Sequence, residues 1–202
     1  MDCDVVLIPE PRTADEAIAA SKDLSRLGSS FVLENGKIFP HLSLYIARFE
    51  PEHASTVEAA LQQIACNIPI IHAQAAGYTF AHKYVVADYQ IAPLMVEAQK
   101  AVVNALNPLR VGMPASEQEN MREATNPQVI NNFEKYGYKY IGDFFRPHIT
   151  LTRFEEEHNE SELGLPPITS FDGNFMSIGL FELGPYSTCV RKLAEFPLLA
   201  VS

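Results

Sequence analysis

The chain of 202 residues has no long apolar run, few cysteines and few basic residues. No apolar stretch approaches the roughly eighteen residues of a membrane span, so we expect no contact with a membrane. The three cysteines are far apart and form no C-x-x-C pair, which predicts free thiols in a reducing compartment. The first residues, MDCDVVLIPEP, contain no basic region of the kind that opens a secretory signal. We therefore expect a cytoplasmic protein.

Basic residues are scarce, since 15 lysines and arginines stand against 25 acidic residues and give a net charge of -10. Nucleic-acid binding depends on lysine and arginine side chains that neutralise phosphates. A long tract of RNA or DNA is therefore not expected as a ligand. A small phosphorylated nucleotide or the terminus of an RNA fits this charge better, and we expect the protein to be a monomer.

Several enzyme motifs are missing. There is no G-x-x-x-x-G-K-[ST] loop, which argues against ATP hydrolysis. The six histidines form no H-E-x-x-H or H-x-x-E-H pattern, and no cysteine lies at ligand spacing, so we expect no metal and no cofactor. Neither Ser43 nor Ser187 lies in a G-x-S-x-G sequence that would support a serine hydrolase triad.

The order of the expected elements indicates one α+β unit over residues 1–202, since no linker rich in proline, glycine or serine divides the chain. A capping box at Thr13 and Glu16 predicts the start of the first helix, and Asn35-Gly36 predicts a hairpin turn. Strands are expected at 3–11, on both sides of that turn, and at 68–79, 82–89, 144–156, 170–183 and 188–196; helices are expected at 13–27, 51–66, 91–106 and 127–136. The segment 107–126 is polar and interrupted by prolines, so we expect a loop insertion there.

Two segments repeat one pattern, IFPHLSLYIARFE at 38–50 and FFRPHITLTRFEE at 144–156. Residues 40–44 align with residues 147–151 without a gap, as Pro-His-aliphatic-hydroxyl-Leu. Side chains alternate along a strand, so each histidine shares a face with the hydroxyl two residues later, while the aliphatic residues face a core. One histidine beside a threonine is more often a structural pair. Two such pairs favour a pseudo-symmetric functional site.

This pair of His-x-Ser/Thr motifs resembles the two-histidine (2H) phosphoesterases, which include the 2'-5' RNA ligase-like proteins and the cyclic nucleotide phosphodiesterases. The resemblance implies an α+β fold of two similar antiparallel-sheet lobes, with outer helices around a central cleft and one motif on each lobe. It also implies a metal-independent phosphoesterase that acts on a 2',3'-cyclic phosphate or a 2'-5' phosphodiester of a nucleotide or RNA end. The choice between hydrolysis and ligation stays open. A non-catalytic phosphate-binding module that kept the cleft is the alternative.

The motifs supply the groups that such chemistry needs. His41 and His148 are the predicted general acid and base, because imidazoles with a pKa near 6.5 allow one to be protonated while the other is neutral. Ser43 and Thr150 are predicted to donate hydrogen bonds to the non-bridging phosphate oxygens, where charge develops. The sequence does not determine which histidine is the acid.

Three further residues are candidates for substrate contacts. Tyr45 and Thr152 share the motif face if their strands are regular, and Tyr186, in the turn LGPYS, could stack on a base. A place in the core or in an ordinary turn is the alternative for each. Arg48 and Arg153 fall on the opposite face of a regular strand, which favours salt bridges over phosphate contacts.

Overall fold

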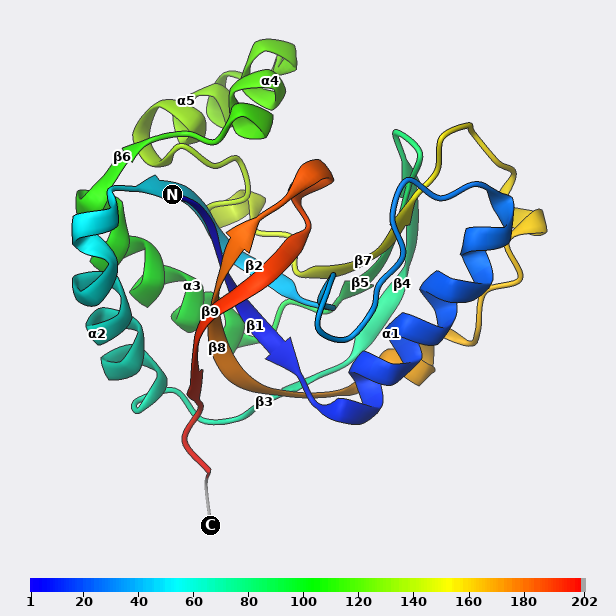
Figure 1. The fold of residues 1–202 in the computed structure, drawn as a ribbon, viewed down its shortest axis with the longest axis horizontal. Coiled ribbons are helices and arrows are strands. Elements are labelled where there is room, and N and C mark those ends of the chain that lie inside the picture. Colours follow the sequence, from blue (N-terminus) through cyan, green and yellow to red (C-terminus); the bar gives the residue numbers. More distant parts are fainter. Residues whose placement is uncertain (201–202) are drawn as a thin grey trace.

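The described part of the chain, residues 1–200 of a computed structural model, contains one antiparallel sheet with helices around it (Figure 1). Its strands are β1 (Asp2–Pro9), β2 (Leu42–Phe49), β3 (Ile71–Ala73), β4 (Ala75–Ala81), β5 (Tyr84–Tyr89), β6 (Arg110–Gly112), β7 (His148–Arg153), β8 (Gly173–Leu183) and β9 (Cys189–Pro197). Its helices are α1 (Pro11–Leu24), α2 (Ala54–Ala65), α3 (Pro93–Leu106), α4 (Ala115–Glu123) and α5 (Pro127–Tyr136).

The sheet has two halves that meet at β2 and β7. The strand order is β3-β8-β1-β2-β7-β5-β4, with β6 beside β2 and β9 beside β8. Between β2 and β7 a single pair, Leu42 with Ile149, is in register among the described residues. The two halves are therefore joined at one point and diverge from it. This arrangement confirms the predicted α+β fold with two antiparallel lobes.

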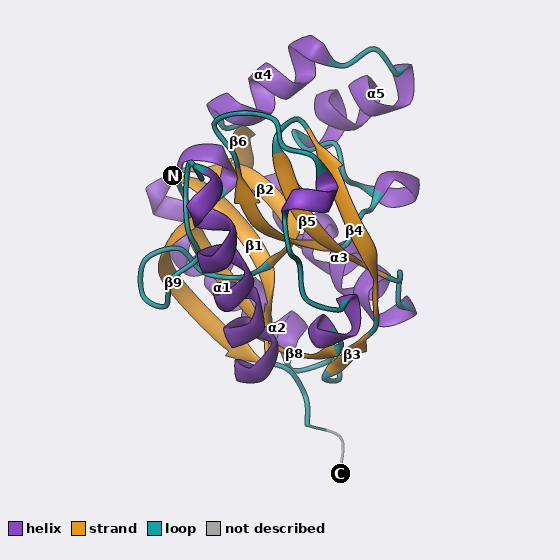
Figure 2. Ribbon diagram, turned by 90° about the vertical axis from the view of Figure 1, so that its right-hand side faces the viewer, coloured by secondary structure: helices purple, strands orange, loops and turns teal. Residues whose placement is uncertain are grey.

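Helices cover the outer side of each half. α2 contacts β8 and β9, and α3 contacts β2, whereas α1 contacts β7; α1 lies on the opposite side of the molecule from α2 and α3 (Figure 1). The buried positions Val57 and Leu61 of α2 follow helical spacing, as do Met95, Ala98 and Val102 of α3. α4 and α5 lie together beyond one end of the sheet (Figure 2). No described helix is both long enough and apolar enough to cross a membrane.

Two local predictions near the amino terminus are wrong. α1 begins at Pro11 with Glu10 as N-cap, and Thr13 is buried inside its first turn. Proline favours the first helical position because it lacks an N–H and its φ is already helical, so it outweighs the capping box. The turn at Asn35-Gly36 forms, but residues 29–38 contribute only isolated bridges and no strand.

The segment 107–126, for which a loop was predicted, contains β6 and α4. The helix sequence ASEQENMRE is rich in residues with high helix propensity. Pro114 and Pro127 stand just outside α4 and at the start of α5, respectively. These prolines therefore mark helix boundaries rather than an irregular loop.

Candidate active site

The two motifs meet where the halves of the sheet join. An antiparallel register that pairs Leu42 with Ile149 sets His41 opposite Thr150 and Ser43 opposite His148. Leu42 and Ile149 are fully buried, so the alternating neighbours face the other side of the sheet. Opposite side chains on one face of a sheet have Cβ atoms about 5 Å apart. The fold thus gathers both imidazoles and both hydroxyls into one cluster, as the repeated pattern predicts.

The two histidines are held in the same way. His41 Nδ1 lies 2.7 Å from the Phe39 carbonyl oxygen, and His148 Nδ1 lies 2.8 Å from that of Arg146. In each motif this carbonyl precedes the proline, whose fixed φ sets the direction of the chain. Because a carbonyl can only accept, Nδ1 carries a hydrogen and Nε2 of a neutral ring is free to take a proton. The Pro-His pair of each motif therefore fixes the tautomer.

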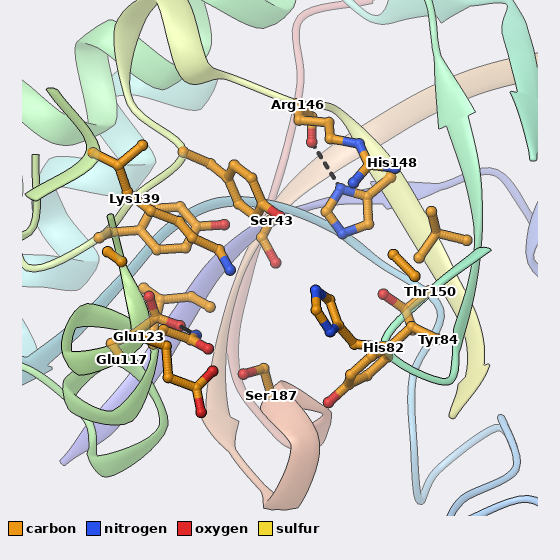
Figure 3. A pocket seen from close by; sticks show the side chains of 18 of the residues that line it. Ser43, His82, Tyr84, Glu117, Glu123, Lys139, Arg146, His148, Thr150 and Ser187 are labelled. Atoms are coloured by element: carbon orange, nitrogen blue, oxygen red, sulfur yellow. Dashed lines mark hydrogen bonds between the residues drawn. The ribbon is translucent and has the colours of Figure 1, made fainter. Parts of the chain in front are cut away.

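The four motif side chains border a pocket of about 790 Å³, a common size for small-ligand sites. Figure 3 shows Ser43, His148 and Thr150 around its open centre, with Nδ1 of His148 turned back to Arg146. Residues from both halves of the sheet and from α4 complete the wall, including His82, Tyr84, Glu117, Glu123, Lys139 and Ser187.

Each motif strand contains one extra residue directly after its hydroxyl. Val5 pairs with Tyr45 and Val6 with Ser43, so that Leu44 is passed over in the pairing of β1 with β2. Thr150 and Thr152 pair with consecutive residues of β5, and Leu151 is passed over in the same way. Such β-bulges change which face the following side chains take. The two halves share this irregularity at equivalent positions.

Tyr45 and Thr152 leave the motif face because of these bulges, and the prediction that they contact the substrate is contradicted. Both are fully buried, and neither lines the pocket. The Tyr45 hydroxyl lies 2.9 Å from Asn107 Oδ1 and 2.8 Å from the Tyr136 carbonyl oxygen. Thr152 donates to the Phe31 carbonyl oxygen at 3.1 Å. Their hydroxyl groups stabilise the core.

Tyr186 and Arg153 lie together on the pocket wall. The Arg153 guanidinium carbon is 4.8 Å from the centre of the Tyr186 ring and 5.7 Å from that of Tyr84, within the range of cation–π contacts. The salt bridge predicted for Arg153 is wrong within residues 1–200, because the bulge turns this side chain to the pocket. Arg48 does form one, with Nε 2.6 Å from Asp2 Oδ1. A role of Tyr186 in substrate binding stays a prediction.

Two turns with left-handed backbone border the pocket. His82 and Lys83, between β4 and β5, have φ of 50° and 70°, and Tyr186 and Ser187, between β8 and β9, both have 58°. Side chains other than glycine rarely adopt these angles, and such strain is concentrated at functional sites. One of these turns belongs to each half of the sheet.

The pocket wall carries basic groups although the chain is acidic overall. Arg146 is held by Asp88, with its Nε 2.9 Å from Oδ1 and an NH2 group 3.0 Å from Oδ2. Lys139 Nζ lies 4.9 Å from the centre of the Tyr140 ring. Together with Arg153, these groups offer positive charge to an anionic ligand. Glu117 of α4 opposes them, and burial raises the pKa of its carboxyl to about 7.

Sequence reasoning missed several residues of the wall. Lys139 reaches the pocket because Gly137, with a φ of 71°, ends α5 and reverses the chain; a glycine directly after a helical pattern is the signal that could have located this turn. Glu117 was hidden by the loop prediction. His82 lies outside the repeated pattern, and no sequence signal marks it as a residue of the wall.

Burial changes the proton affinity of both motif histidines. It lowers the pKa of His41 to about 4 and lowers the pKa of His148 from its ordinary value of 6.5. The hydrogen bonds from Nδ1 to the carbonyl oxygens oppose this shift in both cases. Each imidazole is therefore a weak base, and an anion bound beside it would restore part of its affinity for a proton.

Three side chains at the base of the site lie close enough to share a metal ion. The potential ligand atoms of Asp4, His41 and Cys189 are all within 4.8 Å of one another. Burial and the Asp4 carboxyl raise the pKa of the Cys189 thiol well above its ordinary value, so a metal would have to displace the thiol proton. A metal here would also occupy Nε2 of His41. We therefore do not assign a metal to this cluster.

Comparison with known sequences identifies the family of the chain. Residues 52–165 match the family described as "Protein of unknown function (DUF1045)". The chain belongs to this family. The matched range of this DUF1045 chain includes the second motif and begins after the first, so His41 and Ser43 lie outside it. No curated protein is similar enough in sequence to count as a match.

Solved structures share the fold over nearly the whole length of the DUF1045 chain. TT0787 of Thermus thermophilus has a TM-score of 0.60 at 16% identity, with 99% of both chains covered. E. coli LigT complexed with phosphate has a TM-score of 0.59 at 12% identity, over 98% of this chain and 96% of LigT. LigT complexed with 3'-AMP gives the same score and identity, over 98% and 97%. These likenesses confirm the fold that the resemblance to the 2H phosphoesterases predicts.

Proposed function

We propose that the protein is a metal-independent phosphoesterase that acts on a 2',3'-cyclic phosphate or a 2'-5' phosphodiester of a nucleotide or RNA end. The observation that carries this proposal is the paired geometry of His41 and His148. Both rings are held through Nδ1 by the carbonyl two residues earlier, and both border one pocket beside a hydroxyl. A histidine with a purely structural role does not require a second copy across the sheet.

The size and charge of the pocket support a small phosphorylated ligand. Lys139, Arg146 and Arg153 offer positive charge, while the acidic residues of α4 on the same wall would repel the further phosphates of a long nucleic acid. LigT, which shares the fold, has been solved with phosphate and with 3'-AMP. A mononucleotide or the last nucleotide of an RNA therefore fits best.

In the hydrolysis of a cyclic phosphate, one imidazole takes a proton at Nε2 from the attacking water. The oxygen of that water forms a new bond to phosphorus while the bond from phosphorus to one ribose oxygen breaks. The other imidazole donates its proton to this leaving oxygen, which becomes a free hydroxyl. Ser43 and Thr150 donate hydrogen bonds to the non-bridging oxygens, whose charge grows in the transition state. Each positioned proton transfer contributes about 10²- to 10⁴-fold to the rate.

Turnover of 2',3'-cyclic mononucleotides in the presence of EDTA tests this proposal. We expect the same kcat and KM with and without the chelator, because all the reacting groups are side chains of the protein. A variant in which both His41 and His148 are replaced provides the background for contaminating activity. Loss of turnover in EDTA, restored by a divalent ion, would replace the proposed mechanism with a metal-dependent one.

The pH profile of kcat/KM is expected to be bell-shaped, with its maximum at acidic pH. The imidazole that acts as acid must be protonated in the free enzyme, and its pKa is below 6.5 whichever histidine it is. Activity should therefore fall with rising pH already below 6.5, and the acidic limb should extend towards the value of about 4 given for His41. The two limbs belong to the coupled pair.

The profile of kcat provides the internal control for this prediction. It reports the complex with substrate, in which the phosphate anion raises the pKa of both imidazoles. We expect its alkaline limb at higher pH than that of kcat/KM. Initial rates measured from about pH 4 to about pH 9 at constant ionic strength give both profiles. An optimum of kcat/KM above about pH 7 would contradict the assigned histidines.

A further inference from the structure

Asp4 is a buried carboxylic acid directly beneath the pocket. It lies on β1 and is fully buried, with Oδ2 2.6 Å from Ser43 Oγ and with no hydrogen-bond partner for Oδ1. A buried carboxylate normally has a cation or several donors beside it, because an uncompensated buried charge is very costly. None of the lysine or arginine ion pairs among residues 1–200 includes Asp4. Burial of the Asp4 carboxyl therefore destabilises the folded protein, and its packing does not account for an acid at this position.

The groups that face Asp4 do not stabilise a negative charge there. Nε2 of His41 lies 3.6 Å from Oδ2, too far for a hydrogen bond, and the thiol of Cys189 lies at 4.0 Å. Glu117 adds a further acidic group nearby, and Tyr138 is a neutral phenol close to it. Burial raises the pKa of Asp4 well above its ordinary value, against the smaller opposing effect of Ser43. Its full burial, without a cation beside it, favours the neutral, protonated form of Asp4.

The protonation of Asp4 determines where the hydrogen of Ser43 points. An ionised carboxylate only accepts, so Ser43 would have to donate to Asp4 and could not donate into the pocket. A neutral acid carries its own O–H, and Ser43 Oγ is the nearest acceptor for it. A hydroxyl has one donor and can accept a second hydrogen bond. Ser43 can thus accept from Asp4 and donate its own hydrogen to a ligand.

We propose that Asp4 is a positioning residue of the phosphate site, whose carboxylic acid donates to Ser43 Oγ and so directs the Ser43 hydroxyl into the pocket. This inference rests on the proposed function of the same site. Asp4 does not touch the ligand itself, since its own oxygens are not exposed. The second motif differs: among residues 1–200 the acid is hydrogen-bonded to Ser43, and no hydrogen bond joins Thr150 to an acidic side chain. Both hydroxyls are thus proposed to donate to the phosphate, but only that of Ser43 is oriented by a neighbouring acid.

The test compares Asp4→Asn with Asp4→Val. Asparagine keeps a donor for Ser43 Oγ and carries no charge, so it should rescue kcat to near the wild-type value. Valine fills the site without a donor, and we expect kcat to fall by about tenfold or more. In a Ser43→Ala background Asp4→Val should cause no further loss. Asp2→Asn, on the same strand but outside the pocket, is the matched control for kcat.

Equal losses in the asparagine and valine variants would show that Asp4 acts as a charge and would overturn the inference, as would full activity of Asp4→Val. Binding of inorganic phosphate, measured by calorimetry, separates this result from the fate of the proposed function. If the wild type binds phosphate without turning over cyclic phosphates, the proposed function fails. In that case the inference about Asp4 still predicts that Asp4→Val binds phosphate more weakly than the wild type and Asp4→Asn do. Equal phosphate binding by all three proteins would overturn it.

Thermal stability gives a second readout in case the valine variant does not fold. A raised pKa means that the folded state keeps a proton that the unfolded chain has lost, so stability falls as pH rises from about 3.8 towards the pKa of folded Asp4. Asp4→Asn removes this effect. We expect its Tm to exceed that of the wild type at neutral pH and to approach it near pH 4. A lower Tm at neutral pH would show that Asp4 is ionised.

Discussion

Replacing either motif histidine by asparagine is expected to lower kcat by 10²-fold or more, with little change in Tm. The asparagine amide can take the place of Nδ1, so His148→Asn keeps the hydrogen bond to the Arg146 carbonyl and His41→Asn keeps the one to Phe39. Neither variant has a group at the position of Nε2, where the proton must be transferred. The substitutions therefore remove the chemistry while retaining the local structure, and steady-state kinetics beside thermal melts measure both.

His72→Ala is the matched control for these variants. His72 is exposed on β3 and lies outside the pocket, and its one side-chain hydrogen bond among residues 1–200 is to Asn174 Oδ1, at 3.3 Å. Its replacement should change neither kcat nor Tm. If His41→Asn or His148→Asn remained folded and stayed within about threefold of the wild-type rate, two-histidine acid–base catalysis would be wrong. A drop in Tm without a change in kcat would assign the same histidine a structural role.

The sequence predicts which motif side chains come together, because the governing signal is local and repeated. Between His41 and Ser43, and between His148 and Thr150, the backbone is regular, so the period of two decides which side chains share a face. The prolines before the histidines further restrict each backbone. The pairing of the two motif strands depends on residues far apart in the sequence, and only the repetition of the pattern indicates it.

The prediction fails two residues later because the bulges have no sequence signal. Leu44 and Leu151 are ordinary buried leucines, and no glycine marks the extra residue, as it does in some other bulges. The extra residue depends on how β1 and β5 pair with the motif strands, which is a property of the whole sheet. Tyr45, Thr152 and Arg153 were therefore all assigned to the wrong face.

The outer wall of the pocket could not be predicted for a different reason. The helix α4 has a suitable composition, but its position over the motifs depends on tertiary packing that no short pattern encodes. Asp4 is a related case. Nothing in the apolar stretch CDVVLIP marks this acid as part of the site, and only the structure shows that it lies beneath Ser43.

Thr150 and Thr152, two residues apart on β7, are expected to give opposite results when their hydroxyls are removed. Thr150 faces the pocket, and Thr150→Ala should lower kcat by about 10²- to 10³-fold, or about 2.7 to 4 kcal/mol of transition-state stabilisation, because a donor to the phosphoryl oxygens is lost. Thr152→Val leaves the Phe31 carbonyl unpaired in the core. It should cost about 1 to 3 kcal/mol of unfolding free energy and leave kcat of the folded enzyme unchanged.

Comparing Ser43→Ala with Thr150→Ala separates the catalytic role of the Ser43 hydroxyl from its structural role. Ser43→Ala removes both the donor to the ligand and the partner of Asp4, so kcat and Tm should both fall, whereas Thr150→Ala should change kcat alone. Thr150→Ser keeps the donor and should be milder than Thr150→Ala. The effects should fall on kcat rather than KM, because the charge on the phosphoryl oxygens is greatest in the transition state. If Thr150→Ala lowered Tm and left kcat unchanged, Thr150 would be a polar residue satisfied on its strand, and the phosphate site would have to be sought elsewhere in the pocket.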